Sequence, residues 1–342
     1  MGIKVGINGF GRIGRMVFRA GLKNPNIEFV AVNDPFMTPD YMAYMLKYDT
    51  MHGRYDGTIE YDENSITVDG KKVLFFAEMD PKNIPWGKVG ADYVVESTGV
   101  FLTKEKAQAH IDGGAKKVIM SAPSKDDTPM FVMGVNQDTY TKDMTFVSNA
   151  SCTTNCLAPM VKVLDDKFGV EKGMMSTIHS YTNDQRILDL PHKDPRRARA
   201  AAINIIPTTT GAAKAIGEVM PNLKGSLNGA SFRVPTPTGS LTDFVAVLKK
   251  DVTVEEVNAA MKEAAEGPLK GILAYSEEAL VLQDIVSDPH SCIFDSGFTY
   301  VVGGNLVKVC GWYDNEWGYS NRAAQAMKKL GDSLGCGCSC GK

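Results

Sequence analysis

The first 150 residues alternate short apolar runs with segments of helical periodicity. Apolar runs of strand length lie at residues 3–8, 27–33, 93–96, 117–120 and 145–147, and helical patterns follow the first run, through Leu22, and again at 104–110. A parallel strand pair needs a crossover connection, which is usually a helix. The alternation therefore predicts a doubly wound parallel sheet.

Beyond residue 152 the pattern changes to longer strand-like runs, at 174–179, 230–234, 242–249, 298–302 and 306–313. Because few helical segments separate these runs, they predict an α+β domain with a mostly antiparallel sheet. The segment 181–210 is polar and too long for a turn, which predicts a functional loop. A last helix is predicted at 320–330, and we expect it to pack on the first domain.

A glycine-rich turn joins the first strand to the first helix. Gly9, Gly11 and Gly14 fit the G-x-G-x-x-G pattern between a strand and a helix. In that context the glycines allow a tight turn and the close approach of a pyrophosphate to the helix N-terminus. The turn predicts a Rossmann-type dinucleotide site; the alternative is a glycine turn that serves packing alone.

Asp34 ends the second strand, twenty residues after Gly14. A carboxylate at this place accepts hydrogen bonds from the ribose hydroxyls of the adenosine and repels a 2′-phosphate. No arginine follows closely, since the next residues are Pro35, Phe36 and Met37. The sequence therefore favours NAD over NADP as the cofactor.

A candidate nucleophile begins the second half of the chain. Ser151 is a natural N-cap, so Cys152 is predicted on the first turn of a helix, where the positive end of the helix dipole lowers the pKa of a thiol. A cysteine nucleophile beside NAD indicates aldehyde oxidation through a hemithioacetal and a thioester. The alternative for Cys152 is a buried cysteine that only fills the core.

His179 is the candidate base, because it closes a predicted strand in the same half as Cys152. The other histidines lie in polar surroundings and are predicted at the solvated surface: His52, His110, His192 and His290. Cys156 lies one helical turn beyond Cys152, but no third and fourth ligand follow at zinc-like spacing, so we expect a buried bystander and no metal site.

Basic and hydroxyl-bearing residues predict phosphate recognition. Arg197 lies in the long loop, residues 208–211 (TTTG) precede a helical pattern, and Arg233 lies in a strand. Guanidinium groups, hydroxyls and a helix N-terminus are the usual means of holding a phosphate, so a phosphorylated aldehyde is the expected substrate. Arg196 and Arg199 are assigned instead to a solvated or subunit-contact face.

Composition narrows the class of partner. The chain has 342 residues, 37 Lys and Arg, 40 Asp and Glu, and a net charge of −3. With no block of like charge, neither nucleic acid nor a membrane is expected as the main partner. Seven cysteines make a poor disulfide framework, and the first residues show no leader pattern, so we expect a cytoplasmic protein.

Five segments carry a resemblance to a known family: residues 7–14 (INGFGRIG), 150–159 (ASCTTNCLAP), 181–185 (YTNDQ), 233–237 (RVPTP) and 312–316 (WYDNE). From about residue 3 to residue 330 the chain resembles the phosphorylating, NAD-type glyceraldehyde-3-phosphate dehydrogenase family. The resemblance implies that Cys152 is the acylated nucleophile and that His179 is the base. It further implies a homotetramer in which the 181–210 loop meets a neighbour's cofactor.

The resemblance also assigns binding residues. It implies NAD contacts by Arg12, Ile13, Asp34, Ser121 and Asn315, with Asn315 orienting the nicotinamide carboxamide. It implies that Thr182 and Arg233 hold the phosphate of D-glyceraldehyde 3-phosphate and that Arg197 serves the phosphate-binding region. The attacking inorganic phosphate, which converts the thioester to 1,3-bisphosphoglycerate, would be held by Ser151, Thr153, Thr210 and Gly211. Leu190 and Pro191 resemble the NAD-preferring members.

These inferences give an expected domain plan. Residues 1–150, completed by a helix at about 316–331, form the NAD-binding domain, and residues 151–315 form the catalytic and substrate domain. Residues 332–342 form a Cys/Gly-rich tail, for which a flexible end is favoured over a soft-metal site or a redox switch.

Two features depart from the family pattern. One is the cysteine tail; the other is Met79, where many relatives carry arginine near the adenine. Two other functions stay open: an erythrose-4-phosphate dehydrogenase, which hydrolyses its thioester, and a binding protein on the same fold. The intact pair of Cys152 and His179 counts against the second.

Overall fold

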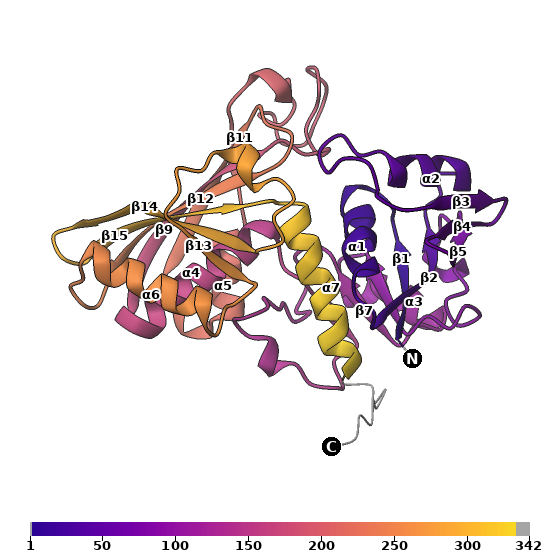
Figure 1. The fold of residues 1–342 in the computed structure, drawn as a ribbon, viewed down its shortest axis with the longest axis horizontal. Coiled ribbons are helices and arrows are strands. Elements are labelled where there is room, and N and C mark those ends of the chain that lie inside the picture. The colour runs from indigo at the N-terminus through magenta and orange to yellow at the C-terminus, as the bar shows by residue number, and fades with distance from the viewer. Residues whose placement is uncertain (1, 333–342) are drawn as a thin grey trace. The chain divides into compact units, whose positions relative to one another are not determined.

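The computed structural model describes residues 2–332 and separates them into two compact units. The first unit comprises residues 2–131, 138–150 and 320–332, and the second comprises residues 132–137 and 151–319. Figure 1 shows the elements of both units. Residues 333–342 of the predicted cysteine tail lie outside the described residues, so the expectation for that tail stays a prediction.

The first unit is built on an eight-stranded sheet in the order β3-β4-β5-β2-β1-β6-β7-β8. Its strands are β1 (Ile3–Asn8), β2 (Ile27–Asn33), β3 (Ile59–Asp62), β4 (Ser65–Val68), β5 (Lys71–Phe76), β6 (Tyr93–Glu96), β7 (Lys117–Met120) and β8 (Phe146–Ser148). Its helices are α1 (Arg12–Leu22), α2 (Pro39–Lys47), α3 (Lys104–Asp112), the short η1 (Pro81–Asn83) and most of α7 (Trp317–Asp332), and η2 (Gln137–Thr139) lies where the units divide. The pairs from β5 to β8 are parallel, as predicted, whereas β3, β4 and β5 form an antiparallel edge that the sequence analysis missed.

The apolar residues of β1 and β2 fill the core of this unit. Val5 and Ile7 on β1 are fully buried, and Phe18 of α1 packs on Phe29 of β2 with 4.6 Å between ring centres. Because β1 and β2 run parallel and are central, their carboxyl ends bring the glycine-rich turn and Asp34 to one edge of the sheet.

His110 is not at the surface, so that prediction is wrong. Its side chain is fully buried on α3, where Trp86 Nε1 donates to His110 Nδ1 over 3.1 Å. Its Nε2 therefore carries the proton and donates to Glu96 Oε2 over 2.9 Å. Asn8 Nδ2 donates to the same carboxylate over 2.7 Å, so the histidine belongs to a buried polar network that no local pattern reveals.

The second unit is built on a seven-stranded sheet in the order β10-β11-β9-β12-β15-β14-β13. Its strands are β9 (Val170–Ser180), β10 (Ile206–Thr209), β11 (Leu227–Val234), β12 (Ser240–Leu248), β13 (Leu273–Ser276), β14 (Cys292–Val302) and β15 (Leu306–Tyr313). Its helices are α4 (Cys152–Phe168), α5 (Ala212–Val219), α6 (Val254–Glu266) and the short η3 (Ala201–Ile203), η4 (Pro221–Leu223) and η5 (Leu282–Ile285). Most neighbouring pairs are antiparallel, with β11·β9 and β13·β14 parallel, which agrees with the predicted α+β class.

Helices α4, α5 and α6 pack against this sheet, and Figure 1 shows them on one of its faces. The missed helix α6 has a capping box, in which Thr253 accepts from the Glu256 amide while Glu256 accepts from the Thr253 amide. Strand β10 lies inside the segment predicted as a loop. Within the described range, no helix combines the length and the apolar character needed to cross a membrane.

Candidate active site

Cys152 is the first residue of α4, as the cap predicted. The Ser151 side chain accepts a hydrogen bond from the Thr154 amide over 3.0 Å and so closes the helix N-terminus. Ala150, just before the cap, adopts a left-handed backbone with φ of 55°. Such a conformation costs about 1 kcal/mol or more in a non-glycine residue and is typical of functional turns.

His179 lies near the end of β9, and its Nε2 is 3.5 Å from the Cys152 sulfur. Its Nδ1 lies 2.7 Å from the Ser180 carbonyl oxygen, which can only accept a hydrogen bond. We therefore assign the proton to Nδ1. Arg233 Nη1 lies 2.8 Å from Nδ1 as well as 3.0 Å from the Ser180 carbonyl oxygen, and with the proton on Nδ1 it donates to the carbonyl. The Nε2 lone pair then faces the thiol, so the thiol can donate its proton to the imidazole.

Charge and burial keep both partners neutral. Burial lowers the pKa of His179 to about 3, and the positive charge of Arg233 lowers it further. Cys152 as a residue is half-buried, but its sulfur lies in dense surroundings, and this burial raises the pKa of the thiol above its ordinary value. Arg233 and hydrogen bonds from Thr153 oppose the rise without cancelling it. The raised pKa is opposite to the lowered pKa predicted from the helix N-terminus, because desolvation of the buried sulfur is the largest influence on this thiol.

Thr153 also ties the site to a residue that the sequence analysis missed. Its hydroxyl is buried and lies 2.8 Å from the Tyr313 hydroxyl, which is in turn 2.8 Å from the Thr177 hydroxyl. The Tyr313 ring meets the His179 ring edge to face, with 6.0 Å between centres. Tyr313 thus supports both the nucleophile segment and the base. Its position in the recognised motif at 312–316 was the available signal.

The side chain of Asn315 is fixed by hydrogen bonds to its amide oxygen, Oδ1. Its Oδ1 accepts from the Gly239 amide over 2.9 Å, from Ser180 Oγ over 3.0 Å and from Ser240 Oγ over 3.3 Å. Three donors on Oδ1 fix the orientation of the amide, so Nδ2 is the atom left to donate to a ligand. Because Ser180 follows His179 directly, Asn315 belongs to the same part of the second unit.

Arg233 joins the site through strand register, since it pairs with His179 between the parallel strands β11 and β9. Arg197 lies farther out in the loop, where Nη1 donates to Asp184 over 2.5 Å and Nε donates to Thr208 Oγ1 over 3.0 Å. Its positive charge still lowers the pKa of His179, so it lies within electrostatic reach of the base.

Three predicted ligands are not joined to the pair by a side-chain contact. Thr182 lies in a turn with Gln185, whose amide donates to the Thr182 carbonyl over 2.9 Å. Thr210 Oγ1 accepts from the Ala212 amide over 3.2 Å, and Gly211 is the exposed N-cap residue of α5. These residues lie on loop and helix-start backbone within the second unit.

A cavity of about 420 Å³ in the first unit contains much of the predicted cofactor site, including Gly9, Gly11 and Asp34. Gly9 has a φ of 90°, and a side chain on Gly14 would lie well within 3.0 Å of the Gly9 carbonyl oxygen, so neither position takes a larger residue without strain. A Cβ on Gly11 would meet nothing within 4 Å, which leaves the backbone open to a ligand. These features fit a dinucleotide pyrophosphate.

The other predicted cofactor residues lie outside this lining. The Arg12 side chain is paired with the nearly inaccessible carboxylate of Asp49. Partial burial raises the pKa of Asp49, but hydrogen bonds from Arg12 and two loop amides outweigh it and lower the pKa to about 2. Ile13 packs on the core, and the Ser121 amide donates to the Glu96 carbonyl over 2.9 Å. The Asp49 ion pair therefore fixes the orientation of the Arg12 side chain, which is 26% exposed.

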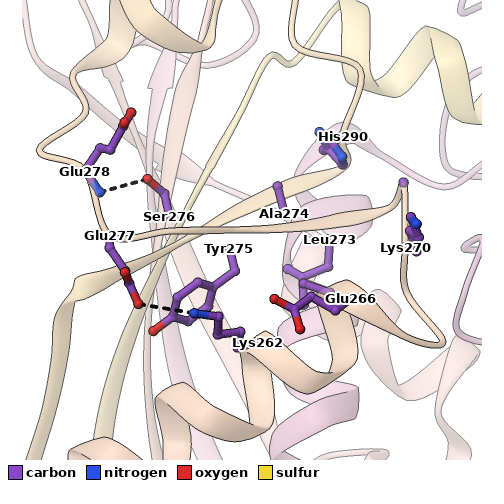
Figure 2. A pocket seen from close by; sticks show the side chains of 12 residues that line it. Lys262, Glu266, Lys270, Leu273, Ala274, Tyr275, Ser276, Glu277, Glu278 and His290 are labelled. Atoms are coloured by element: carbon purple, nitrogen blue, oxygen red, sulfur yellow. Dashed lines mark hydrogen bonds and ion pairs between the residues drawn. The ribbon is translucent and has the colours of Figure 1, made fainter.

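The remaining cysteines of the described range are free thiols, and Cys156, Cys292 and Cys310 are buried. No cluster of three or more metal-ligating side chains occurs within residues 2–332. A further cavity of about 500 Å³ lies beside α6 and β13, where Lys262 pairs with Glu277 over 3.6 Å and lies over the Tyr275 ring (Figure 2). Its lining includes none of the predicted site residues.

Comparisons with known proteins agree with this geometry. Residues 3–104 match the family model for the glyceraldehyde 3-phosphate dehydrogenase NAD binding domain, and residues 151–315 match the model for the C-terminal domain. The chain is 61% identical over 323 residues to a glyceraldehyde-3-phosphate dehydrogenase of Geobacillus stearothermophilus, covering 94% of this chain and 96% of the relative. It is 59% identical over 337 residues to one of Streptomyces coelicolor, covering 98% and 100%, and 59% identical over 334 residues to glyceraldehyde-3-phosphate dehydrogenase 1 of Bacillus subtilis, covering 96% and 99%.

The matched segments contain both the glycine-rich turn and the pair of Cys152 and His179. They confirm the fold class and the cofactor, NAD, that the sequence predicted. The chain belongs to the glyceraldehyde-3-phosphate dehydrogenase family of NAD-dependent oxidoreductases.

Proposed function

We propose that this chain oxidises D-glyceraldehyde 3-phosphate to 1,3-bisphosphoglycerate with NAD and inorganic phosphate, through a hemithioacetal and a thioester on Cys152. The observation that carries the proposal is the 3.5 Å approach of the Cys152 sulfur to His179 Nε2, with the Nδ1 proton assigned to a hydrogen bond with the Ser180 carbonyl oxygen. A thiol beside a base whose free nitrogen faces it is the arrangement that nucleophilic catalysis requires.

The first step forms the carbon–sulfur bond. As the sulfur attacks the aldehyde carbon, the thiol proton passes to His179 Nε2, and His179 returns that proton to the former aldehyde oxygen. The thiol and the imidazole are both neutral at rest, so the transfer creates charge only while the bond forms. Thr153 and the positive charge of Arg233 favour negative charge on the sulfur during this step.

The second step removes the hemithioacetal hydroxyl proton. NAD, when bound, accepts the hydride from the same carbon. His179 takes the hydroxyl proton, and a thioester remains on Cys152. An oxygen of inorganic phosphate then attacks the thioester carbon, the carbon–sulfur bond breaks, and the acyl phosphate leaves with the sulfur restored as a thiolate, which regains a proton from His179.

The reaction involves two phosphate groups, one on the substrate and one that attacks the thioester, and each needs its own binding residues. We assign the substrate phosphate to Thr182 and Arg233, and the attacking phosphate to Ser151, Thr153, Thr210 and Gly211, with Arg197 serving this region. Among the described residues, Arg233 Nε, Gln185 Nε2 and Thr236 Oγ1 are buried and have no hydrogen-bond partner, so the protein leaves polar groups of these segments unpaired. The Thr153 hydroxyl can donate to this phosphate while it accepts a hydrogen bond from the Tyr313 hydroxyl.

The cofactor assignments belong to this proposal as well. Gly9, Gly11 and Gly14 with the amides of Arg12 and Ile13 would hold the pyrophosphate, and Asp34 would hold the adenosine ribose. Ser121 is assigned a contact with NAD, and Asn315 would donate from Nδ2 to the nicotinamide carboxamide.

A homotetramer and a cytoplasmic location complete the proposal. The loop at 181–210 exposes large apolar side chains, with Ile187 83%, Leu188 75% and Ile203 79% exposed. On β9, Met174 is exposed while its neighbour Met175 is buried, so an apolar residue also faces away from the helices. Exposed apolar groups of this density support contacts between copies of the chain.

One assay tests the proposal. NADH formation is followed with D-glyceraldehyde 3-phosphate, with and without inorganic phosphate, in the wild type, in Cys152→Ser and in Cys156→Ser. We expect phosphate-dependent NADH formation in the wild type and in the buried control Cys156→Ser, and a loss of at least about 10³-fold in Cys152→Ser. An active Cys152→Ser variant refutes the nucleophile. Sustained turnover without phosphate indicates that the thioester is hydrolysed, and a repeat of the assay with erythrose 4-phosphate then tests the alternative of an erythrose-4-phosphate dehydrogenase.

A further inference from the structure

The cavity that contains Asp34 is lined by a second carboxylate, Glu78. No lysine or arginine belongs to its lining, and Met79 follows Glu78 directly. The sequence analysis named Asp34 as the residue that repels a 2′-phosphate and gave no role to Glu78. The structure therefore shows two acidic groups at one cavity without a cation beside them.

The fold holds the backbone of Glu78 next to Asp34. The Asp34 amide donates to the Phe76 carbonyl over 3.0 Å, which continues the pairing of β2 with β5. The buried Asn33 side chain then accepts from the Glu78 amide over 2.8 Å and donates to the Glu78 carbonyl over 3.0 Å. Asn33 directly precedes Asp34, so the backbone of Glu78 is held close to Asp34, just beyond the ends of the neighbouring strands β2 and β5.

The two carboxylates differ in what they already bind. Asp34 Oδ2 accepts from the Phe10 amide over 2.8 Å and Oδ1 accepts from the Phe36 amide over 3.0 Å, which fixes the side chain with lone pairs left for a ribose. The Glu78 carboxylate has neither an ion pair nor a hydrogen bond with any of residues 2–332. Its charge is therefore uncompensated at the cavity.

We propose that Glu78 is a second specificity-determining residue, which excludes cofactors that carry a phosphate on the adenosine ribose. A 2′-phosphate placed at Asp34 would meet two negative charges on adjacent strand ends, and Met79 supplies no cation to offset them. The inference rests on the proposed function only in taking NAD as the cofactor. It predicts that neutralising Asp34 alone leaves discrimination against NADP in place.

The test measures binding and needs no turnover. Dissociation constants for NAD and NADP are measured by titration calorimetry, with competition against NAD where NADP binds weakly, for the wild type, Glu78→Gln and Glu60→Gln. Glu60 is exposed on β3 and outside the cavity lining, so the control removes the same charge from the same unit. The measurements are repeated at low and high salt, because an electrostatic effect weakens with ionic strength whereas a loss of shape does not.

We expect Glu78→Gln to shift the NADP-to-NAD affinity ratio toward NADP by about tenfold at low salt, by less at high salt, and Met79→Arg to shift it in the same direction. Glu60→Gln should leave the ratio within about twofold. An unchanged ratio in Glu78→Gln, or an equal shift in the control, overturns the proposal. A chain that binds NAD selectively through Glu78 yet fails to oxidise the aldehyde would refute only the proposed function.

Discussion

The glycine-rich turn offers a comparison of two alanine substitutions, three residues apart, that should fail in different ways. A Cβ on Gly14 would lie well within 3.0 Å of the Gly9 carbonyl oxygen, whereas a Cβ on Gly11 would meet nothing within 4 Å. Gly9 cannot move freely, because Ser97 Oγ donates to its carbonyl over 2.6 Å. Gly14→Ala should therefore damage the fold, and Gly11→Ala should damage only ligand binding.

The magnitudes follow from the contacts. Overpacking against backbone costs roughly 3 kcal/mol at the upper end of its usual range, and alanine regains about 1 kcal/mol over glycine within a helix. Gly14→Ala should thus lower the free energy of unfolding by about 2 kcal/mol. Gly11→Ala replaces an N-cap glycine and should cost only about 0.5 kcal/mol, but its methyl group enters the cavity where the pyrophosphate approaches.

Urea unfolding without cofactor measures the first effect, and calorimetric titration with NAD measures the second. We expect a lower urea midpoint for Gly14→Ala and a near-normal one for Gly11→Ala, whose affinity for NAD should fall by at least about tenfold. If Gly14→Ala has the same urea midpoint as the wild type, the contact with the Gly9 carbonyl oxygen does not exclude a side chain at position 14. If Gly11→Ala binds NAD normally, the pyrophosphate does not approach this residue.

Two further substitutions test the buried polar groups. His179 accepts a proton at about pH 3 when folded and near its ordinary pKa of 6.5 when unfolded, so the unfolded chain binds more protons between these values. The stability contributed by neutral His179 should therefore be lost as the pH falls from about 6.5 toward 4, by up to about 1.4 kcal/mol per pH unit. In urea unfolding, the free energy of unfolding of His179→Gln should depend less steeply on pH in this window than that of the wild type. Equal slopes for the two proteins would contradict this prediction. His110→Leu should lower the free energy of unfolding by about 2–4 kcal/mol, because it leaves Trp86 Nε1 without a partner and the buried Glu96 Oε2 with Asn8 as its one remaining donor. A cost no greater than that of the exposed Gln108→Leu would show that the network contributes little.

Much of the cofactor site was readable from the sequence because local rules govern it. The turn between β1 and α1 needs glycine, the strand period places Asp34 at the end of β2, and Ser151 caps α4 at Cys152. Each of these features depends on residues within a few positions of one another. The edge strands β3 to β5 and the short β10 and β13 were missed because four to six residues carry too little periodic signal.

The tertiary structure decided what depends on residues distant in the chain. His179 contacts Cys152, which lies 27 positions earlier in the chain, and Arg233 lies beside His179 through strand register. The Asn33 side chain binds the backbone of Glu78, which lies 45 positions later. Protonation also depends on the surroundings as a whole. The helix N-terminus at Cys152 was legible in the sequence, but packing around the sulfur reversed the expected shift of its pKa. Local backbone preferences are written in neighbouring residues, whereas burial and long-range contacts exist only once the chain has folded.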